Sequence, residues 1–369
     1  MKKNVAVFFG GISVEREVSV ITGVLTLNSI DRKKYNPVPV FIDETGVWYT
    51  GEELFEIENY KEKKFRKIKR VSLILGDDNL YVVGKRKLKK LFEIAVGINC
   101  LHGEAGEDGS LSGVLKCSFI PSASPQALPS ALFMDKSATK VFLKGMGVKT
   151  LPCFTVRATQ NVEEEVKKIA EKGFPLIVKP ACSGSSVGIS KVNDERELFR
   201  AVGTAFKYGE KVVIERCLEN FTEINCAVYR NANGEVVSSE CERPVGKEEV
   251  LSFSDKYKCG SREFPANISP KIRLYVKKTA EKIYERLIDV GTVRLDFMVK
   301  GQDVYLNEVN TVPGSLAYYL FCDTLKDFSR LLDEQIALSE RNFARNVSLN
   351  RKIDCELLDI KGVKGSKRL

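Results

Sequence analysis

The stretch VRLDFMVKGQDVYLNEVNTVPG, residues 293–314, holds two runs of alternating apolar and polar side chains separated by Gly301. Alternation with a period of two is typical of β-strands, and a glycine between two such runs predicts a hairpin. Upstream of it, KVVIERCL and INCAVYRNANGEVVSSE also read as antiparallel strands, and ISPKIRLYVKKTAEKIYERLID reads as a long amphipathic helix. We therefore expect an α+β architecture around this hairpin.

Four polar side chains give the hairpin a chemical character. Arg294 and Asp296 are two residues apart, so they share one face of their strand. Glu308 and Asn310 have the same spacing on the other strand. Two carboxylates and an amide suit a hard divalent cation, with Mg²⁺ bridging phosphates as the natural case. Arg294 would then stabilise negative charge on a reacting group, and a purely structural Arg–Asp pair is the alternative interpretation.

A second stretch, FPLIVKPACSGSSVGISKV at 174–192, combines a strand that delivers Lys179 with a glycine-serine loop. Glycines let backbone N–H groups approach phosphate oxygens, and a fixed lysine adds a point charge. The spacing is not that of a P-loop, and an ordinary tight turn is the alternative. Together with Lys136 in MDKSATK and the acids of the hairpin, the loop indicates a nucleoside triphosphate site. Glu215 and Glu223 could take ribose hydroxyls.

The first 120 residues alternate strands and helices, which predicts a parallel α/β domain. NVAVFFGG is expected to be a buried strand, followed by a helix through VEREVSVITGVLTLNSI with Ser13 as its N-cap. VSLILGDDNLYVVG reads as a hairpin with Asp-Asp-Asn at its turn, and FEIAVGINCLHG reads as one apolar strand.

Composition excludes several classes of protein. No run of about 18 apolar residues is present, so no transmembrane helix is expected. The ten cysteines form no C-x-x-C pair, which favours reduced thiols in the cytoplasm over zinc ligation. The net charge of +9 comes largely from YKEKKFRKIKR, GKRKLKK and the tail KGVKGSKRL. We interpret these runs as solvated surface and expect neither a nucleic-acid nor a membrane partner, with nucleic-acid binding as the minor alternative.

The only histidine, His102, lies in the glycine-acid turn LHGEAGEDGS. This turn is one of six motifs through which the chain resembles the D-alanine–D-alanine ligases of the ATP-grasp superfamily. The others are FFGGISVEREVS, MDKSATK, FPLIVKPACSGSSVGISKV, SFSDKY and the hairpin stretch, in family order over about residues 4–325.

The resemblance implies an N-terminal α/β domain followed by a two-part ATP-grasp fold. The expected parts are 1–120, a central subdomain at 121–212, a C-terminal subdomain at 213–345, and a basic tail at 346–369 that has no placed counterpart. It also implies that ATP phosphorylates the carboxylate of one D-alanine and that the amine of a second attacks the acyl phosphate. Such a ligase would supply bacterial peptidoglycan synthesis, and the family suggests a homodimer.

The resemblance assigns roles to particular residues of this chain. The residues implied in catalysis are Glu15, Ser185, Tyr257, Arg294 and the backbone N–H of Gly314. Those implied in substrate binding are His102, Lys256, Tyr319 and Leu320. ATP is expected to contact Lys136, Lys179, Glu215 and Glu223, and the magnesium ligands are expected to be Asp296, Glu308 and Asn310. Two Mg²⁺ ions are implied, with Mn²⁺ as a possible substitute.

The sequence departs from the family pattern around the second substrate. Many members carry a serine where this chain has Tyr319, within SLAYYLF, and many carry Tyr-Asp-Tyr before the final Lys-Tyr of the lid, where this chain reads EEVLSFSDKY. D-Serine or another D-amino acid therefore stays open as the acceptor. A non-catalytic nucleotide or D-amino-acid sensor on the same fold is the other alternative.

Overall fold

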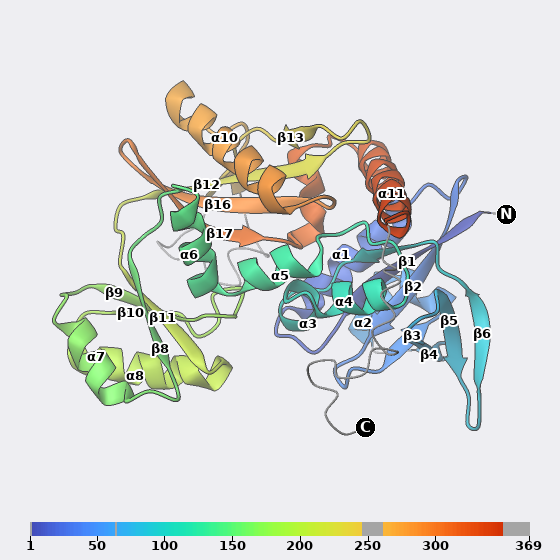
Figure 1. Cartoon of the computed structure of the whole chain (residues 1–369), viewed down its shortest axis with the longest axis horizontal. Coiled ribbons are helices and arrows are strands. Elements are labelled where there is room, and N and C mark those ends of the chain that lie inside the picture. The colour runs from blue at the N-terminus through green and yellow to red at the C-terminus, as the bar shows by residue number, and fades with distance from the viewer. Residues whose placement is uncertain (1, 63–64, 246–260, 350–369) are drawn as a thin grey trace, which may run out of the picture.

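The computed structural model describes residues 2–62, 65–245 and 261–349 of the 369. Three β-sheets follow one another along the chain, and each has helices packed against it (Figure 1). Among the described residues, no helix combines the length and the apolar character that crossing a bilayer requires. The expected mixture of a parallel-containing α/β sheet and a two-part ATP-grasp fold is confirmed.

The first sheet has the strand order β6-β5-β4-β3-β2-β1-β7. Strand β1 is parallel to β2 and β7, whereas β3 to β6 are joined by antiparallel pairings, so the expected parallel strands form one part of a mixed sheet. Its strands are β1 Lys3–Gly10, β2 Tyr35–Ile42, β3 Trp48–Thr50, β4 Lys69–Leu73, β5 Asn79–Val83, β6 Leu88–Glu93 and β7 Val96–Asn99. Its helical segments are α1 Arg16–Ser29, η1 Glu52–Phe55, α2 Ile57–Glu62, α3 Glu104–Glu107 and α4 Ser110–Cys117.

Two expectations for this region need correction. Residues 92–102 do not form one strand, because β6 ends at Glu93 while β7 starts at Val96 and pairs with β1. The N-cap position of α1 is Glu15. The Ser13 hydroxyl instead accepts a 3.0 Å hydrogen bond from the Glu15 N–H, which fixes the turn before the helix. The predicted hairpin with Asp-Asp-Asn in its turn is confirmed by the antiparallel pairing of β4 and β5.

The second sheet has the order β10-β9-β11-β8, and the third has the order β13-β12-β16-β17. The second sheet and its helices comprise β8 Cys153–Arg157, α7 Val162–Ala170, β9 Leu176–Pro180, β10 Ser190–Val192, α8 Glu195–Ala205, η2 Phe206–Tyr208 and β11 Lys211–Arg216. The third sheet comprises β12 Thr222–Arg230, β13 Val236–Ser238, β16 Val293–Lys300 and β17 Asp303–Asn310, and the long helix α10, Pro270–Leu287, covers its outer face. A small sheet pairs β14 Arg243–Val245 with β15 Ser261–Glu263.

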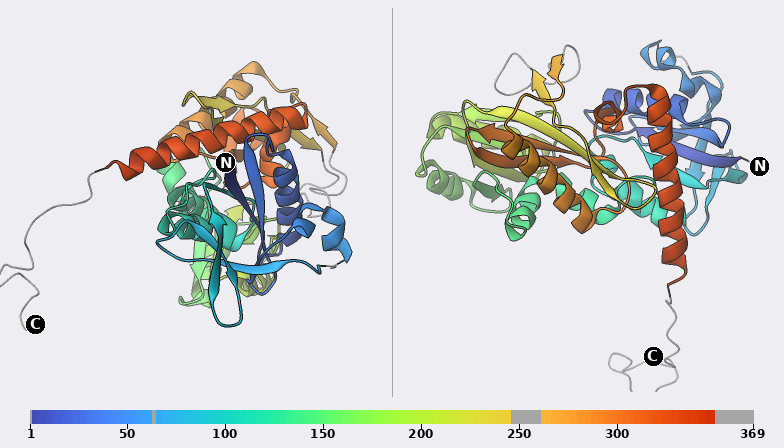
Figure 2. Two further views of the ribbon diagram at one scale, coloured as in Figure 1. Left: turned by 90° about the vertical axis from the view of Figure 1, so that its right-hand side faces the viewer. Right: turned by 90° about the horizontal axis from the view of Figure 1, so that it is seen from above.

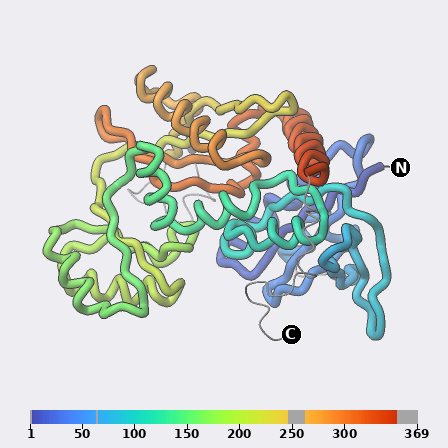
Figure 3. The backbone as a smooth tube through the Cα atoms, in the orientation of Figure 1, coloured from blue at the N-terminus to red at the C-terminus, as the bar shows by residue number. Residues whose placement is uncertain are grey.

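Helices from other parts of the chain complete the hydrophobic cores of the third and first sheets. Helices α5, Ala127–Met134, and α6, Lys136–Gly145, pack in the core of the third sheet through Phe133 and Leu143 (Figure 3). The final helix α11, Leu325–Val347, packs through Phe328 into the core of the first sheet and crosses the molecule (Figure 2). The division of the chain at residues 120, 212 and 345 stays a prediction.

Candidate active site

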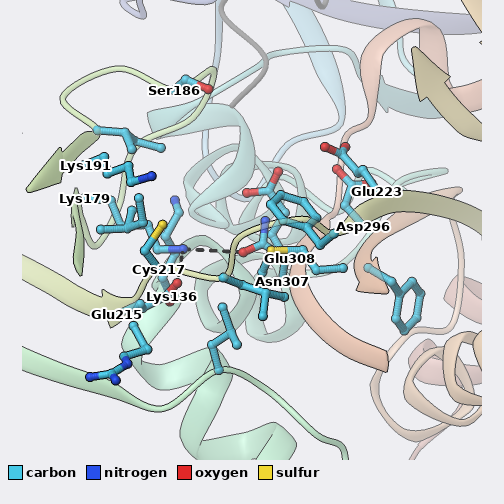
Figure 4. Close-up of a pocket in the computed structure, with 18 of the residues that line it drawn as sticks. Lys136, Lys179, Ser186, Lys191, Glu215, Cys217, Glu223, Asp296, Asn307 and Glu308 are labelled. Atoms are coloured by element: carbon cyan, nitrogen blue, oxygen red, sulfur yellow. Dashed lines mark hydrogen bonds and ion pairs between the residues drawn. The ribbon is translucent and has the colours of Figure 1, made fainter. Parts of the chain in front are cut away.

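A cleft separates the second sheet from the third and collects all four predicted ATP contacts and two of the three predicted metal ligands (Figure 4). Strands β9 and β11 are neighbours in the second sheet and contribute one wall, and the hairpin β16–β17 contributes the other. The cleft is lined by Lys136, Lys179, Ser185, Glu215, Glu223, Asp296 and Glu308, together with apolar side chains such as Ile177, Leu218 and Met298. The fold therefore brings together residues that are up to 172 positions apart in sequence, from Lys136 to Glu308.

A buried triad of charges forms the floor of the cleft. Lys179 Nζ lies 2.8 Å from Glu215 Oε2, and Lys140 Nζ lies 2.9 Å from Glu215 Oε1. Burial by itself would raise the pKa of Glu215, but the two ammonium groups hold that pKa below its ordinary value. Glu215 is thus ionised, and the triad keeps one net positive charge in the cleft.

The sequence prediction missed Lys140. It lies on α6 one turn after Lys136, and residues four apart share a helix face, so this spacing was the available signal. Lys136 itself donates from Nζ to the Ser183 carbonyl of the serine loop, and burial lowers its pKa. Of these two lysines of one helix, Lys136 lines the cleft and Lys140 pairs with Glu215, which lines it too.

The hairpin places its polar side chains as the alternation predicted. Arg294 pairs in register with Asn310, and Asp296 with Glu308, so all four project from one face. Arg294 holds Asp296 with two hydrogen bonds, Nε–Oδ1 at 2.7 Å and Nη2–Oδ2 at 2.8 Å, while Asn310 Nδ2 lies 3.0 Å from Asp296 Oδ2. The Arg294 guanidinium neutralises the buried Asp296 carboxylate. Burial alone would lower the pKa of Arg294, but the negative charge of Asp296 holds that pKa well above its usual range.

A β-bulge interrupts the hairpin next to this group. The register shifts after Asp296, and Asn307 is the residue without a partner. Its Oδ1 accepts a 3.5 Å hydrogen bond from Lys179 Nζ, so the bulge joins the two walls of the cleft. Sequence alone did not identify Asn307, because a one-residue bulge leaves no mark in the alternation.

The donor set on the hairpin fits a divalent cation. Asp296, Glu308 and Asn310 offer two carboxylates and one amide oxygen on one face, which are the hard ligands that Mg²⁺ takes. Over the described residues, no three His, Cys, Asp or Glu side chains gather as a metal cluster.

A hydrogen bond connects the serine loop to the N-terminal end of α1, which packs on the first sheet. Ser185 Oγ donates to the Glu15 carboxylate at the start of α1. Ser185 and Ser186 have φ of 49° and 61°, a left-handed conformation that costs energy outside glycine and is typical of functional loops. Gly184 is required beside them, because a Cβ there would lie 2.4 Å from Glu15 Oε2.

His102 is buried, and its Nε2 lies 3.0 Å from Thr22 Oγ1. The same Thr22 oxygen accepts a 3.0 Å hydrogen bond from the N–H of Ser315, the residue after Gly314. Burial and the positive charge of Arg294 lower the pKa of His102 to about 3, so the imidazole is neutral near pH 7.

Glu107 of the same turn also contacts the segment that precedes Gly314. It accepts hydrogen bonds from the N–H of Gly103 at 2.8 Å and from the N–H of Val312 at 3.4 Å. Burial and the neighbouring carboxylate of Glu15 raise the pKa of Glu107 to about 8. The sequence alone did not assign a role to Glu107. Its position in the turn LHGEAGEDGS, two residues before Gly109, was the only feature that could have pointed to one.

Tyr319 and Leu320 lie at the end of η3, Gly314–Leu320, whose Ser315, Leu316 and Ala317 adopt left-handed φ of 50° to 52°. The Tyr319 hydroxyl is 3.4 Å from Arg294 Nη1, and burial raises the pKa of that phenol. The guanidinium of Arg262 lies over the Tyr319 ring at 5.0 Å. Leu320 is buried, whereas the predicted lid residues Lys256 and Tyr257 lie outside the described residues.

Two sheets that face each other across a lysine-rich and carboxylate-rich cleft define an enzyme of the ATP-grasp class. Family models of the D-ala D-ala ligase N-terminus and C-terminus match residues 4–124 and 142–333. A D-alanine–D-alanine ligase of Thermosipho melanesiensis is 36% identical over 97% of this chain and 99% of its own length.

Solved structures agree with these matches. The D-alanine–D-alanine ligase of Helicobacter pylori superposes with a TM-score of 0.74 at 32% identity, covering 90% of this chain and 99% of that one. The VanG D-Ala:D-Ser ligase of Enterococcus faecalis has a TM-score of 0.77 at 28% identity, covering 92% and 100%. The chain therefore belongs to the D-alanine–D-alanine ligase family, as its motifs predicted, and it is an ATP-dependent ligase.

Proposed function

We propose that the protein joins two molecules of D-alanine into D-alanyl-D-alanine, for peptidoglycan precursor synthesis, with ATP converted to ADP and phosphate. The γ-phosphoryl group passes to the carboxylate of the first D-alanine, and the amine of the second attacks the resulting acyl phosphate. The observation that carries the proposal is the face shared by Arg294, Asp296, Glu308 and Asn310, set across the cleft from Lys179.

The nucleotide would occupy the cleft between the second and third sheets. Lys136 and Lys179 supply the positive charge for its phosphates, and the serine loop supplies backbone N–H groups. Glu215 and Glu223 line the same cleft and are placed to accept hydrogen bonds from ribose hydroxyls. The apolar side chains Ile177 and Met298 offer a slot for the base.

Divalent metal dependence follows from the family, and Asp296, Glu308 and Asn310 are the residues that fit the metal. We propose two Mg²⁺ ions, with Mn²⁺ as a substitute. A metal held by these residues would supply positive charge to offset the charge of the phosphate oxygens. Arg294 would add its charge where the tetrahedral oxyanion forms, beside the N–H of Gly314.

The first D-alanine would lie between the two acids of the N-terminal domain and Arg294. Glu15 and Glu107 repel one another, and this repulsion contributes to the raised pKa of Glu107. A substrate ammonium would relieve it, so the pair is suited to hold the amino group. His102 can hydrogen-bond to the substrate without adding charge, because its imidazole is neutral.

The second substrate would bind near Tyr319 and Leu320. The Tyr319 hydroxyl can donate to a carboxylate, as the serine of many family members does. Lys256 and Tyr257 would close the site from the lid and exclude water from the acyl phosphate. We further propose a cytoplasmic homodimer that needs neither nucleic acid nor a membrane for turnover.

The test is an acceptor screen on the purified chain. Phosphate release is measured with ATP, Mg²⁺ and D-alanine alone, and then with D-serine, D-lactate or L-alanine added, and the products are identified by mass spectrometry. D-Alanyl-D-alanine as the main product supports the proposal. A mixed dipeptide with D-serine formed in preference would assign the acceptor to D-serine, and nucleotide binding without any product would identify a sensor.

A further inference from the structure

The outer strands of the first sheet carry most of the net charge of the protein. Residues 65–93, here called the basic extension, contain nine Lys and Arg against three Asp and Glu, a net charge of +6 out of +9 for the whole chain. They include β4, β5 and β6, of which β6 is the edge of the sheet. In Figures 1 and 2 the β5–β6 hairpin projects from the body of the molecule, at the end opposite α7 and α8.

The bases of the extension are exposed and unpaired. All nine have exposed side chains, namely Arg66, Lys67, Lys69, Arg70, Lys85, Arg86, Lys87, Lys89 and Lys90. None forms an ion pair with any residue in the described ranges. Elsewhere exposed lysines do pair, as Lys167 with Glu163 at 2.7 Å and Lys278 with Glu281 at 2.8 Å. The bases of the extension therefore make none of the close ion pairs seen on these helices, although Glu53 and Asp77 lie near Lys67 and Lys90.

Protection of a free sheet edge accounts for only part of this pattern. Lysines on an edge strand prevent pairing with another chain, which explains Lys89 and Lys90 of β6. It does not explain Lys69 and Arg70, because β4 is an interior strand between β3 and β5. Nor does it explain the bases of the β5–β6 turn.

Apolar side chains are exposed next to these bases. Leu75 is 66% exposed and Leu88 is 45% exposed. Both line a shallow groove that also contains Val83 and Arg70. Leu88 pairs in register with Val83, on the face of the sheet opposite the buried Leu80. Exposed leucines therefore lie among exposed bases: by strand alternation Arg70 and Lys90 share the face of Leu88, whereas Lys69 and Lys89 project from the other face.

We propose that the basic extension is a docking surface for an anionic lipid bilayer. Cations attract acidic headgroups, and the two leucines can enter the boundary between headgroups and acyl chains. This combination favours a bilayer over nucleic acid, because nucleic-acid bases stack on exposed aromatic rings. The aromatic rings of the extension, such as Tyr81 and Phe92, are half-buried, and the Tyr81 hydroxyl donates a hydrogen bond to Asp77. Docking there would leave the cleft open, because the cleft lies between the other two sheets.

The test is co-sedimentation of the full chain with vesicles. We expect binding to vesicles of equal parts phosphatidylglycerol and phosphatidylcholine in 0.1 M salt, and at least tenfold weaker binding to phosphatidylcholine alone. The triple variant Lys85→Glu, Lys87→Glu, Lys89→Glu should bind at least tenfold more weakly. The matched control Lys167→Glu, Lys168→Glu, Lys278→Glu changes the net charge equally on other surfaces and should retain binding within about twofold.

Folding is checked independently of docking. Both triple variants should keep the nucleotide-dependent phosphate release of the parent chain, since none of these lysines lines the cleft. Leu75→Ser with Leu88→Ser should reduce the binding that remains at 0.5 M salt. Equal binding to both vesicle types, equal loss in the control variant, or binding to duplex DNA without binding to vesicles would each overturn the proposal.

Discussion

Replacing Arg294 should separate turnover from nucleotide binding. Its guanidinium holds Asp296 through two hydrogen bonds of 2.7 and 2.8 Å, and its Nη1 points toward the Tyr319 hydroxyl at 3.4 Å. In Arg294→Ala the charge that would meet the developing oxyanion is absent. Loss of one such stabilising group costs about 3–4 kcal/mol, so kcat should fall by about 10²- to 10³-fold. The nucleotide Kd measured without divalent cation should change by less than about threefold, because the phosphate lysines stay in place.

The same variant should also show a metal-dependent change in stability. Asp296 is only 2% exposed, and removing its guanidinium leaves a buried carboxylate unpaired, which costs about 3–5 kcal/mol. A divalent cation restores the missing charge, so Mg²⁺ with nucleotide should raise the unfolding temperature of Arg294→Ala more than that of the parent. Arg294→Lys keeps the charge without the two-pronged contact and should recover stability but not turnover.

These effects are measured by phosphate release, by calorimetric titration with a non-hydrolysable nucleotide, and by thermal unfolding with and without Mg²⁺. The reasoning fails if Arg294→Ala keeps kcat within tenfold of the parent. It fails equally if the nucleotide Kd rises as much as kcat falls, because the arginine would then act in binding the ground state.

Three further predictions concern the neighbouring residues. Tyr319→Ser should change the acceptor KM by at least about threefold and the ATP KM by less than about twofold, because its hydroxyl contacts Arg294 and Tyr319 does not line the nucleotide cleft; an unaltered acceptor KM would place the tyrosine outside that subsite. Lys140→Met breaks a buried ion pair and should lower unfolding stability in urea by about 3–5 kcal/mol, while Lys167→Met, at an exposed pair, should lower it much less; equal losses would contradict the account of the triad. His102 has a folded pKa of about 3 against 6.5 in the unfolded chain, so between these values the unfolded chain binds the additional proton and stability falls as pH falls. From pH 6.5 to 5 this amounts to about 2 kcal/mol, and His102→Gln should show a correspondingly shallower decline in urea unfolding; an identical slope would refute the assignment.

The hairpin illustrates how far sequence reasoning reaches. Period-two alternation placed Arg294, Asp296, Glu308 and Asn310 on one face, and the register of β16 with β17 agrees. Strand alternation depends only on the geometry of the backbone, so it can be predicted without knowing what packs on either side. The glycine-serine loop and the helix that starts at Lys136 were found for the same reason, since both signals are local.

The errors have a common physical origin. The extent of β6 and the start of β7 depend on which strands pair, and an apolar run cannot specify its partner. The N-cap position of α1 fell at Glu15 because the Ser13 hydroxyl was already engaged by a local backbone N–H. Lys140 was missed because its partner Glu215 is supplied by β11 of another sheet.

By itself, the sequence determined the family, the strands and helices that bear the reactive groups, and the chemical types of those groups. Only the tertiary structure decided which of them meet: that Glu215 joins two lysines, that Asn307 bulges toward Lys179, and that Ser185 reaches Glu15 across 170 residues. The reason is that secondary structure follows from interactions within a few residues, whereas these contacts depend on how separate sheets pack. The distances and burial that set each pKa exist only after that packing.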